Sequence, residues 1–320
     1  MYAVSVTARC DHCDSGCAKR TATRTIAAMF ADSLVALVTP MTADEALDLP
    51  AWQRLIEFHI AHGTAGVVVG GTTGESATLT EAELLQLVRE AQAVAAGRLQ
   101  VIAGAGLSST AATVERVRAL APLRPDGLLV VTPAYVKPTQ EGLFRHYAAV
   151  AAASDLPVIL YNVPGRTGVD LAPATAGRLA ALPSIVALKE AVAGPARIRE
   201  LRAAAPDLAL LSGDDPTARE ALLAGAVGVI SVTANIAPRG IADMVAAARR
   251  GDAARAAELD GRLAGLHTAL FLEPNPIPAK WALARMGLMG EGIRLPLTPL
   301  SPEVQPKVLS ALQQAGIIPG

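Results

Sequence analysis

The sequence has 320 residues, 52% of them apolar, and a formal net charge of −1. That length and apolar content favour either one large α/β barrel or two ordinary domains. The near-neutral charge gives no reason to expect nucleic acid or an anionic membrane as a partner, and no apolar run is long enough to span a bilayer.

The first 28 residues form an unusual segment. They hold all three cysteines of the chain, Cys10, Cys13 and Cys17, together with His12. A metal site could be drawn from these side chains, but His12 lies between two of the cysteines and no second ligand pair follows. The segment also lacks the apolar stretch of a signal peptide. We therefore expect residues 1–28 to be a dispensable, disordered extension, or an upstream start before a natural start at Met29. The rest of the chain has no cysteine, which favours a reducing, cytoplasmic setting.

From residue 34 onward, short β-type runs alternate with amphipathic stretches rich in Ala and Leu. The predicted strands are 34–38, 66–69, 101–103, 127–131, 158–161, 185–189, 208–211 and 228–231, and the predicted helices are 50–62, 80–96, 110–122, 140–153, 172–181, 195–204, 216–224 and 237–250. Eight β-then-α units predict a (β/α)8 TIM barrel. A doubly wound open sheet is the alternative, although no Gly-x-Gly-x-x-Gly follows the first strand.

Residues 251–320 differ from this repeating pattern. They contain three more helical patterns and two Pro-rich breaks, at 274–278 and 295–302. We expect a catalytic barrel over residues 29–250 and a C-terminal helical region, residues 251–320, packed on it.

Lys189 ends the otherwise apolar run 185–188, which has the composition of a buried strand in a parallel sheet. Burial makes an ammonium group costly, and it favours the free amine that can form a Schiff base with a carbonyl. The alternative is a strand-end lysine whose ammonium reaches solvent.

The unusual polar segments fall at the C-terminal ends of the predicted strands, where TIM barrels carry their reacting groups. Their polar members are Thr72 and Thr73 after the second strand, Tyr135 after the fourth, Tyr161 and Arg166 at the fifth, Ser212, Asp214 and Asp215 after the seventh, and Ser231, Thr233 and Asn235 after the eighth. Each has a structural alternative: a glycine-rich turn, tyrosines that pack inside the barrel, an arginine paired with a structural carboxylate, and a helix cap in the Ser-Gly-Asp-Asp segment.

Together these groups suit one chemistry. Backbone N–H groups and the hydroxyls of Thr72 and Thr73 can hold a carboxylate, and Arg166 can bind another in a bidentate manner. Tyrosine and threonine hydroxyls can pass protons beside Lys189. Since no His, Asp or Glu cluster has metal-ligand spacing, these residues predict a class I aldolase or related lyase that acts on a 2-keto acid such as pyruvate, with neither metal nor cofactor.

Several longer motifs carry a resemblance. Residues 71–76, 161–168 and 189–190 resemble the dihydrodipicolinate synthase/N-acetylneuraminate lyase family, and 211–215, 228–235 and 273–278 are similar to its synthase branch. The similarity runs from about Met29 to the C-terminus. It implies Schiff-base condensation of pyruvate with L-aspartate 4-semialdehyde to 4-hydroxy-tetrahydrodipicolinate, the first committed step of diaminopimelate and lysine biosynthesis.

The resemblance also implies a role for each motif residue. Lys189 would form the pyruvate imine, Tyr161 would be the central acid/base, and Thr72 would connect it to Tyr135 in a proton relay. Tyr135 would reach in from a neighbouring subunit, which implies a homotetramer built as a dimer of dimers. The substrate-binding residues would be Thr73 for the pyruvate carboxylate, Arg166 for the semialdehyde carboxylate, and Gly213 and Ile230 through their backbone carbonyls.

Two other functions compete with this one. Another pyruvate-dependent aldolase of the same family would have less use for Arg166 and Tyr135, and a catalytically silent keto-acid sensor would not need every catalytic group. The resemblance further implies insensitivity to L-lysine, because Ala134, Ser108 and Ala112 stand where lysine-sensitive members carry tyrosine, asparagine and glutamate. Those members also carry a histidine or similar polar group at the positions of Glu81 and Leu84, of which Glu81 could supply a replacement acid.

Overall fold

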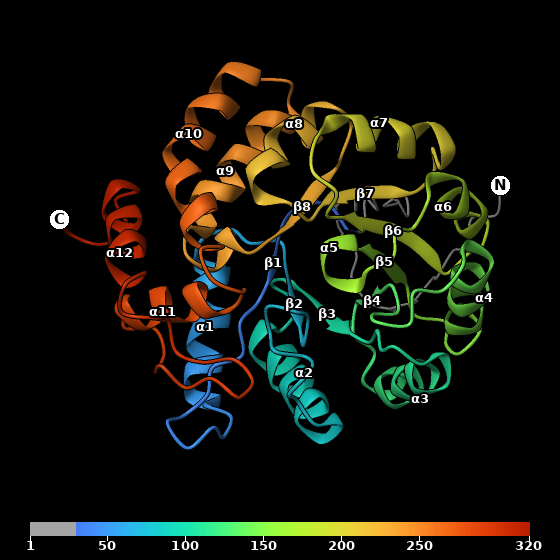
Figure 1. Ribbon diagram of the computed structural model, residues 1–320, viewed down its shortest axis with the longest axis horizontal. Helices are drawn as coiled ribbons and strands as arrows, with labels where there is room; N and C mark the ends of the chain where they lie inside the picture. The colour runs from blue at the N-terminus through green and yellow to red at the C-terminus, as the bar shows by residue number, and fades with distance from the viewer. Residues whose placement is uncertain (1–29) are drawn as a thin grey trace, which may run out of the picture.

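The computed structural model describes residues 30–320, and its centre is a closed barrel of eight parallel strands in chain order (Figure 1). The strands are β1 (Asp32–Ala36), β2 (Gly66–Val69), β3 (Gln100–Gly104), β4 (Gly127–Val131), β5 (Val158–Asn162), β6 (Ile185–Glu190), β7 (Ala209–Ser212) and β8 (Gly228–Ser231). Because β8 pairs with β1, the sheet has no free edge. The predicted TIM barrel is confirmed, and the open sheet is wrong.

The first strand lies two residues earlier than predicted. Asp32 already pairs with Gly228 of β8, so the ladder begins there. At the other end, the backbone N–H of Val38 donates to the side chain of Asn235 over 3.1 Å instead of continuing the ladder. The apolar run 34–38 therefore continues two residues past the end of β1.

Helices cover the outside of the barrel in the order that the sequence predicts (Figure 1). They are α1 (Leu49–Ala61), α2 (Glu81–Ala95), α3 (Thr110–Leu120), α4 (Gln140–Ala151), α6 (Pro173–Ala180), α7 (Pro195–Ala204), α8 (Ala218–Leu223) and α9 (Pro238–Arg249), with short 3-10 turns at η2 (Ala121–Leu123), η3 (Asp215–Thr217) and η4 (Thr233–Asn235). One further helix, α5 (Pro164–Thr167), is a single turn after β5 that the sequence analysis missed.

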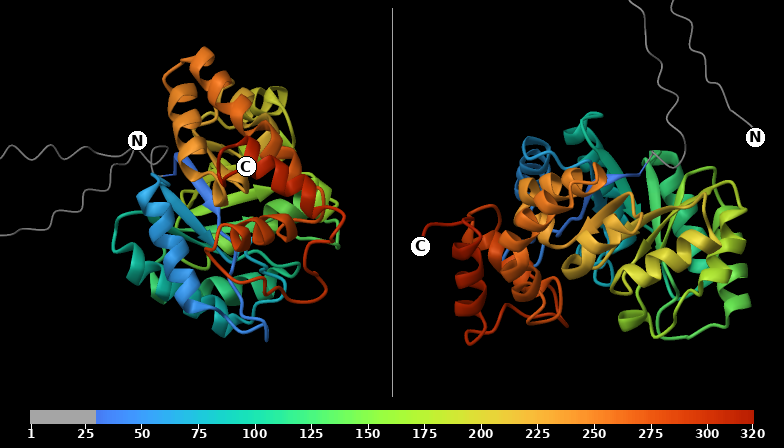
Figure 2. Two further views of the ribbon diagram at one scale, coloured as in Figure 1. Left: turned by 90° about the vertical axis from the view of Figure 1, so that its left-hand side faces the viewer. Right: turned by 90° about the horizontal axis from the view of Figure 1, so that it is seen from above.

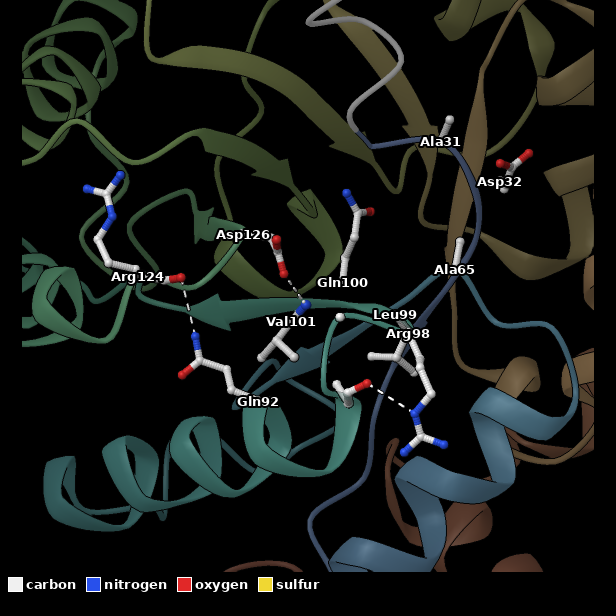
Figure 3. A pocket seen from close by; sticks show the side chains of 12 residues that line it. Ala31, Asp32, Ala65, Gln92, Arg98, Leu99, Gln100, Val101, Arg124 and Asp126 are labelled. Atoms are coloured by element: carbon white, nitrogen blue, oxygen red, sulfur yellow. Dashed lines mark hydrogen bonds between the residues drawn. The ribbon is translucent and has the colours of Figure 1, made fainter. Parts of the chain in front are cut away.

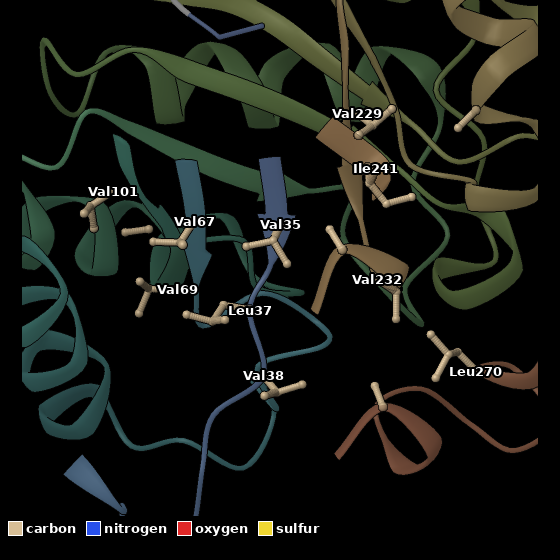
Figure 4. Close-up of a cluster of buried hydrophobic side chains, with 14 of the residues drawn as sticks. Val35, Leu37, Val38, Val67, Val69, Val101, Val229, Val232, Ile241 and Leu270 are labelled. Atoms are coloured by element: carbon tan, nitrogen blue, oxygen red, sulfur yellow. The ribbon is translucent and has the colours of Figure 1, made fainter. Parts of the chain in front are cut away.

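The strands bury both faces, as a barrel wrapped in helices requires. One face packs against the helices: Val35, Val67 and Val229 share a cluster with Ile241 of α9 (Figure 4). The alternate residues fill the barrel interior, where Leu34, Ile102, Ile159, Leu211 and Ile230 form a second cluster. This interior cluster lies inside the barrel, below the polar residues at the C-terminal ends of the strands.

The C-terminal region forms the three predicted helices, α10 (Ala253–Ala269), α11 (Ile277–Arg285) and α12 (Gln305–Gln314). They lie together on one side of the barrel, beside α1 and α9 (Figures 1 and 2). The connections before and after α11 return to the barrel, where they contact the loop that follows β2.

Two expectations concern segments rather than the barrel. The proposed extension, residues 1–28 with its cysteines and His12, lies outside the described residues. Within residues 30–320, none of the helices combines the length and apolar character that a membrane crossing needs.

Candidate active site

Lys189 and Tyr161 lie side by side at the C-terminal ends of β6 and β5. The two residues are register partners in the sheet. Lys189 is only 4% exposed, and its Nζ lies 4.2 Å from the centroid of the Tyr161 ring. An amine that is buried over an aromatic face is shielded from water. The structure thus places the predicted imine-forming lysine against the predicted acid/base.

Gly213 leaves room for the lysine side chain. A Cβ atom at this position would lie 2.8 Å from Lys189 Cε and 3.0 Å from its Cγ. Its own N–H donates to the Glu190 carbonyl over 2.7 Å, which holds the two strand ends together. Ile230, 1% exposed, belongs to the interior cluster that also contains Tyr161. Both predicted backbone-lining residues therefore lie at the site.

The residues that follow Tyr161 and Lys189 point to the opposite side of the sheet. Glu190 accepts hydrogen bonds from Asn162 Nδ2 at 3.0 and 3.1 Å, from Val192 N at 2.8 Å and from Arg197 Nε at 2.9 Å. Burial raises the pKa of Glu190, and these donors oppose that rise. This buried network fixes the ends of β5 and β6 from behind, and the sequence analysis did not identify it.

Thr72 and Thr73 lie in a tight loop after β2. The loop closes on itself, since Gly74 N and Ser76 N both donate to the Gly71 carbonyl, at 3.0 and 3.2 Å. Thr72 lines a small cavity together with Tyr161. Thr73 is 1% exposed, and its Oγ1 accepts from Asn275 Nδ2 over 2.9 Å. The loop therefore brings Thr72 beside Tyr161, and Asn275 of the C-terminal region fixes Thr73.

Arg166 lies on the one-turn helix α5, exposed at the barrel mouth. Its Nη2 donates to the backbone carbonyl of Asn275 over 3.3 Å. Asn275 thus contacts both Thr73 and Arg166, the two predicted carboxylate-binding residues. The motif around Asn275 contributes to the family resemblance without indicating a role for this residue, since a single asparagine within a Pro-rich break carries no further signal.

Tyr135 differs from the other predicted residues, because the structure does not bury it with them. Its side chain is 92% exposed, and its backbone has a left-handed φ of 72°. Its N–H donates to the Thr167 carbonyl over 3.2 Å, which ties the loop to α5. A bulky residue at positive φ is uncommon and marks a conformation that its surroundings enforce.

The acidic residues after β7 have structural roles. Asp214 caps η3, since its carboxylate accepts from Thr217 N over 3.2 Å, as the cap interpretation predicts. Asp215 is buried and accepts from the backbone N–H groups of Val232 and Thr233 at 2.9 and 2.8 Å. The segment therefore joins the ends of β7 and β8.

A separate cavity of about 530 Å³ lies at the opposite, amino end of the strands (Figure 3). Its lining includes Asp32, Gln100 and Asp126, which lie at or just before the starts of β1, β3 and β4. Asp126 accepts from Val101 N over 2.7 Å and so stabilises the strand starts. None of the predicted site residues lines this cavity.

Comparison with known proteins agrees with this geometry. Residues 29–315 match the Dihydrodipicolinate synthetase family. A 4-hydroxy-tetrahydrodipicolinate synthase from Methylococcus capsulatus is 53% identical over 91% of this chain and 100% of its own length. The chloride-inhibited dihydrodipicolinate synthase of Acinetobacter baumannii, solved with pyruvate, superposes with a TM-score of 0.89 at 49% identity, covering 90% of this chain and 99% of that one. The lysine-bound enzyme of Cyanidioschyzon merolae gives 0.88 at 38% identity, covering 91% and 99%. The chain belongs to the dihydrodipicolinate synthetase family.

Proposed function

We infer that this protein is a 4-hydroxy-tetrahydrodipicolinate synthase, a lyase that condenses pyruvate with L-aspartate 4-semialdehyde in the first committed step of diaminopimelate and lysine biosynthesis. The observation that carries this function is the buried Lys189 amine over the Tyr161 ring, in a chain half identical to named synthases over nine-tenths of its length.

The reaction begins with the Lys189 amine. It attacks the keto carbon of pyruvate, and loss of water gives an iminium that withdraws electrons from the adjacent methyl group. Loss of a methyl proton gives an enamine, whose carbon attacks the aldehyde of the second substrate, and the aldehyde oxygen takes up a proton to become the 4-hydroxyl group. The amino group of that substrate then attacks the iminium carbon and displaces the Lys189 amine, which closes the ring and frees the enzyme. Tyr161 gives and takes these protons, a role that the 4.2 Å between its ring centroid and Lys189 Nζ supports.

The surrounding groups bind and orient the two substrates. Thr73 and the N–H groups of its loop hold the pyruvate carboxylate, and Arg166 holds the carboxylate of the semialdehyde. The backbone carbonyls of Gly213 and Ile230 line the same site. Thr72 shares a cavity lining with Tyr161, which suits the proton-relay role.

Tyr135 completes the relay from a second copy of the chain. Its exposed ring and enforced backbone suit a side chain that inserts into a neighbour, and the next residue, Val136, is also 57% exposed. The active unit is therefore at least a dimer, within a homotetramer arranged as a dimer of dimers.

The division of the chain follows from the same proposal. Residues 29–250 form the catalytic barrel and 251–320 the C-terminal helical region, whereas residues 1–28 precede the family match. The enzyme acts in the cytoplasm, where a biosynthetic step finds its substrates.

The test uses the full chain and a chain that starts at Met29. Both should form product from pyruvate and the semialdehyde, and borohydride with pyruvate should give a covalent adduct on the peptide that contains Lys189. Lys189→Ala should stay folded and lose nearly all turnover. An adduct on another lysine would overturn the assignment of Lys189. Turnover of a different aldehyde acceptor alone would indicate another aldolase, and pyruvate binding without turnover would indicate a sensor.

A further inference from the structure

A buried ion pair connects the C-terminal region to the loop that carries Thr72 and Thr73. Glu75, 3% exposed, belongs to that loop, and Lys280, 2% exposed, lies on α11. The Lys280 ammonium donates to Glu75 Oε1, and the backbone N–H of Arg294 donates to Oε2 over 3.2 Å. One carboxylate thus receives bonds from two separate parts of the C-terminal region.

Glu75 is at the point where the loop backbone needs support. It has a left-handed φ of 57°, an uncommon conformation for a residue with a side chain. Its N–H donates to the Thr72 carbonyl over 3.1 Å, and Thr72 and Thr73 precede it by only a few bonds. The Glu75 side chain therefore anchors the same stretch of backbone that carries the two threonines.

Stability alone does not account for this pair. Burial of two charges costs free energy that their attraction only partly returns. Apolar side chains of similar volume in their place often stabilise the folded protein equally well. Burial lowers the pKa of Lys280, and the neighbouring Glu75 carboxylate opposes that change. A pair kept at such cost is best explained by the geometry that it imposes.

We propose that the Glu75–Lys280 pair positions the loop of residues 70–76, so that Thr72 and Thr73 meet the pyruvate imine on Lys189. These are positioning residues, since neither is argued to touch substrate. The proposal rests on the proposed function, and it makes α11 a necessary support of the active site.

The test compares Lys280→Met, Lys280→Arg and the neutral double variant Glu75→Gln/Lys280→Met with the wild-type chain. Arg285→Met is the matched control, because Arg285 lies on the same helix in an exposed pair with Glu291. The measurements are kcat, KM for each substrate, melting temperature and hydrogen exchange of the peptide that spans residues 70–80.

The double variant should stay folded, with a lower kcat and a higher KM for pyruvate. Its kcat/KM for pyruvate should fall by about ten- to a hundred-fold, since small misplacements of reacting groups have effects of that size. Its loop peptide should exchange faster, while the semialdehyde KM, the peptides of β5 and β6, and the Arg285→Met control stay at wild-type values. Lys280→Arg, which keeps the charge, should recover part of the loop protection and of kcat.

Three results would overturn the proposal: wild-type kinetics and loop exchange in the double variant, equal impairment of Lys280→Arg and Lys280→Met, or general unfolding of the double variant. A wild-type chain that forms no imine on Lys189 would contradict the proposed function instead. Hydrogen exchange of the loop peptide still reports whether the Glu75–Lys280 pair positions the loop when no imine forms. Failure of this proposal and failure of the proposed function are therefore distinguishable.

Discussion

At the scale of single residues, the environment of Lys189 explains why a lysine can serve as a nucleophile here. Its stem lies in a gap that only a residue without a Cβ leaves open at position 213, and its amine lies over an aromatic face. Glu190 directs its carboxylate to the other side of the sheet, toward Arg197. The Glu190 carboxylate is therefore paired with Arg197 and not with Lys189.

Gly213→Ala should impair imine formation far more than folding. The backbone of Gly213 is not in the left-handed region, so alanine is tolerated there, but its Cβ would displace the Lys189 stem from contacts of 2.8 and 3.0 Å. We expect a destabilisation of about 1–3 kcal/mol from overpacking and a much slower borohydride-trapped reaction with pyruvate.

Gly261→Ala is the control for this variant, because a Cβ at Gly261 of α10 meets nothing within 4 Å. It should trap pyruvate at the wild-type rate. Equal trapping rates for Gly213→Ala and Gly261→Ala would contradict the role that we give to Gly213.

The residues that sequence patterns could identify are those whose chemistry conflicts with their surroundings. Lys189 follows the apolar run 185–188 and Tyr161 follows the apolar run 158–160, so both stand out, and the structure pairs them in register. Asn275 and Lys280 contact the loop after β2 from 202 and 205 residues away. Such contacts depend on how the C-terminal region packs, which periodicity along the chain does not encode.

At the scale of elements, the C-terminal region is more than an appendage packed on the outside. Arg294, which follows α11, forms a bidentate pair with Glu83 at 2.5 and 2.9 Å, and Glu83 lies in the first turn of α2. The same guanidinium donates to the carbonyls of Thr78 and Glu45 at 2.8 to 3.0 Å. One arginine therefore joins the C-terminal region to two loops and a helix of the barrel.

In Arg294→Met, the free energy of unfolding should fall less than in the wild type when the pH is lowered from 7 to 3. Hydrogen bonds from Arg294 are the largest cause that lowers the pKa of Glu83 from 4.5 to about 2, and hydrogen bonds from Thr80 add to this effect. A lowered pKa in the folded state means that the pair stabilises the protein above pH 4.5 and that this stabilisation is lost as the pH falls toward 2. The shift corresponds to at most about 3 kcal/mol, less what solvent screening removes.

The measurement is the free energy of unfolding in urea at pH 7 and at pH 3, for the wild type and Arg294→Met. The difference between them should be largest at pH 7 and should shrink at pH 3. A difference that is the same at both pH values would show that Arg294 acts through packing and its bonds to the Thr78 and Glu45 carbonyls rather than through its pair with Glu83.

Helices and strands were predictable where the apolar periodicity and the length of a segment both indicate the same kind of element. The eight apolar runs and the long amphipathic helices gave the barrel, because a parallel strand buried on both faces has a distinctive composition. The single turn α5 was missed because four residues, Pro164–Thr167, are too few to show a helical period. That turn carries Arg166, so the missed element holds a predicted site residue.

At the scale of the whole molecule, the proposed proton relay needs Tyr135 from a second chain. Lys189 and Tyr161 are buried, at 4% and 6% exposure, whereas Tyr135 is 92% exposed. If Tyr135 acts in a neighbouring subunit, two inactive variants should repair each other. A dimer of Tyr135→Phe with Lys189→Ala has one site in which both residues are intact.

Mixing equal amounts of the two variants under conditions that exchange subunits should therefore restore about one quarter of wild-type activity, since half of the dimers are mixed and each has one intact site. Each variant alone should stay nearly inactive. No recovery after verified exchange would contradict a shared active site, and so would high activity of Tyr135→Phe alone.

Feedback by L-lysine is the last property that depends on the assembled molecule. The resemblance places an effector site at a subunit interface, and a relative from Cyanidioschyzon merolae has been solved with lysine bound. Here Ala134, Ser108 and Ala112 lack the groups expected to hold the effector, and Leu84, 3% exposed, is buried in the protein. Only Glu81, at the start of α2, supplies an acid.

Each missing charge-assisted contact is worth about 1.5–3 kcal/mol, or roughly tenfold or more in affinity. We therefore expect the initial rate at saturating pyruvate to stay constant as L-lysine rises into the millimolar range. The double variant Ala134→Tyr/Ala112→Glu, which restores two of the absent groups, should gain inhibition. Strong inhibition of the wild type at sub-millimolar lysine would contradict the prediction and would assign the recognition of the effector to Glu81, which Glu81→Gln would then test.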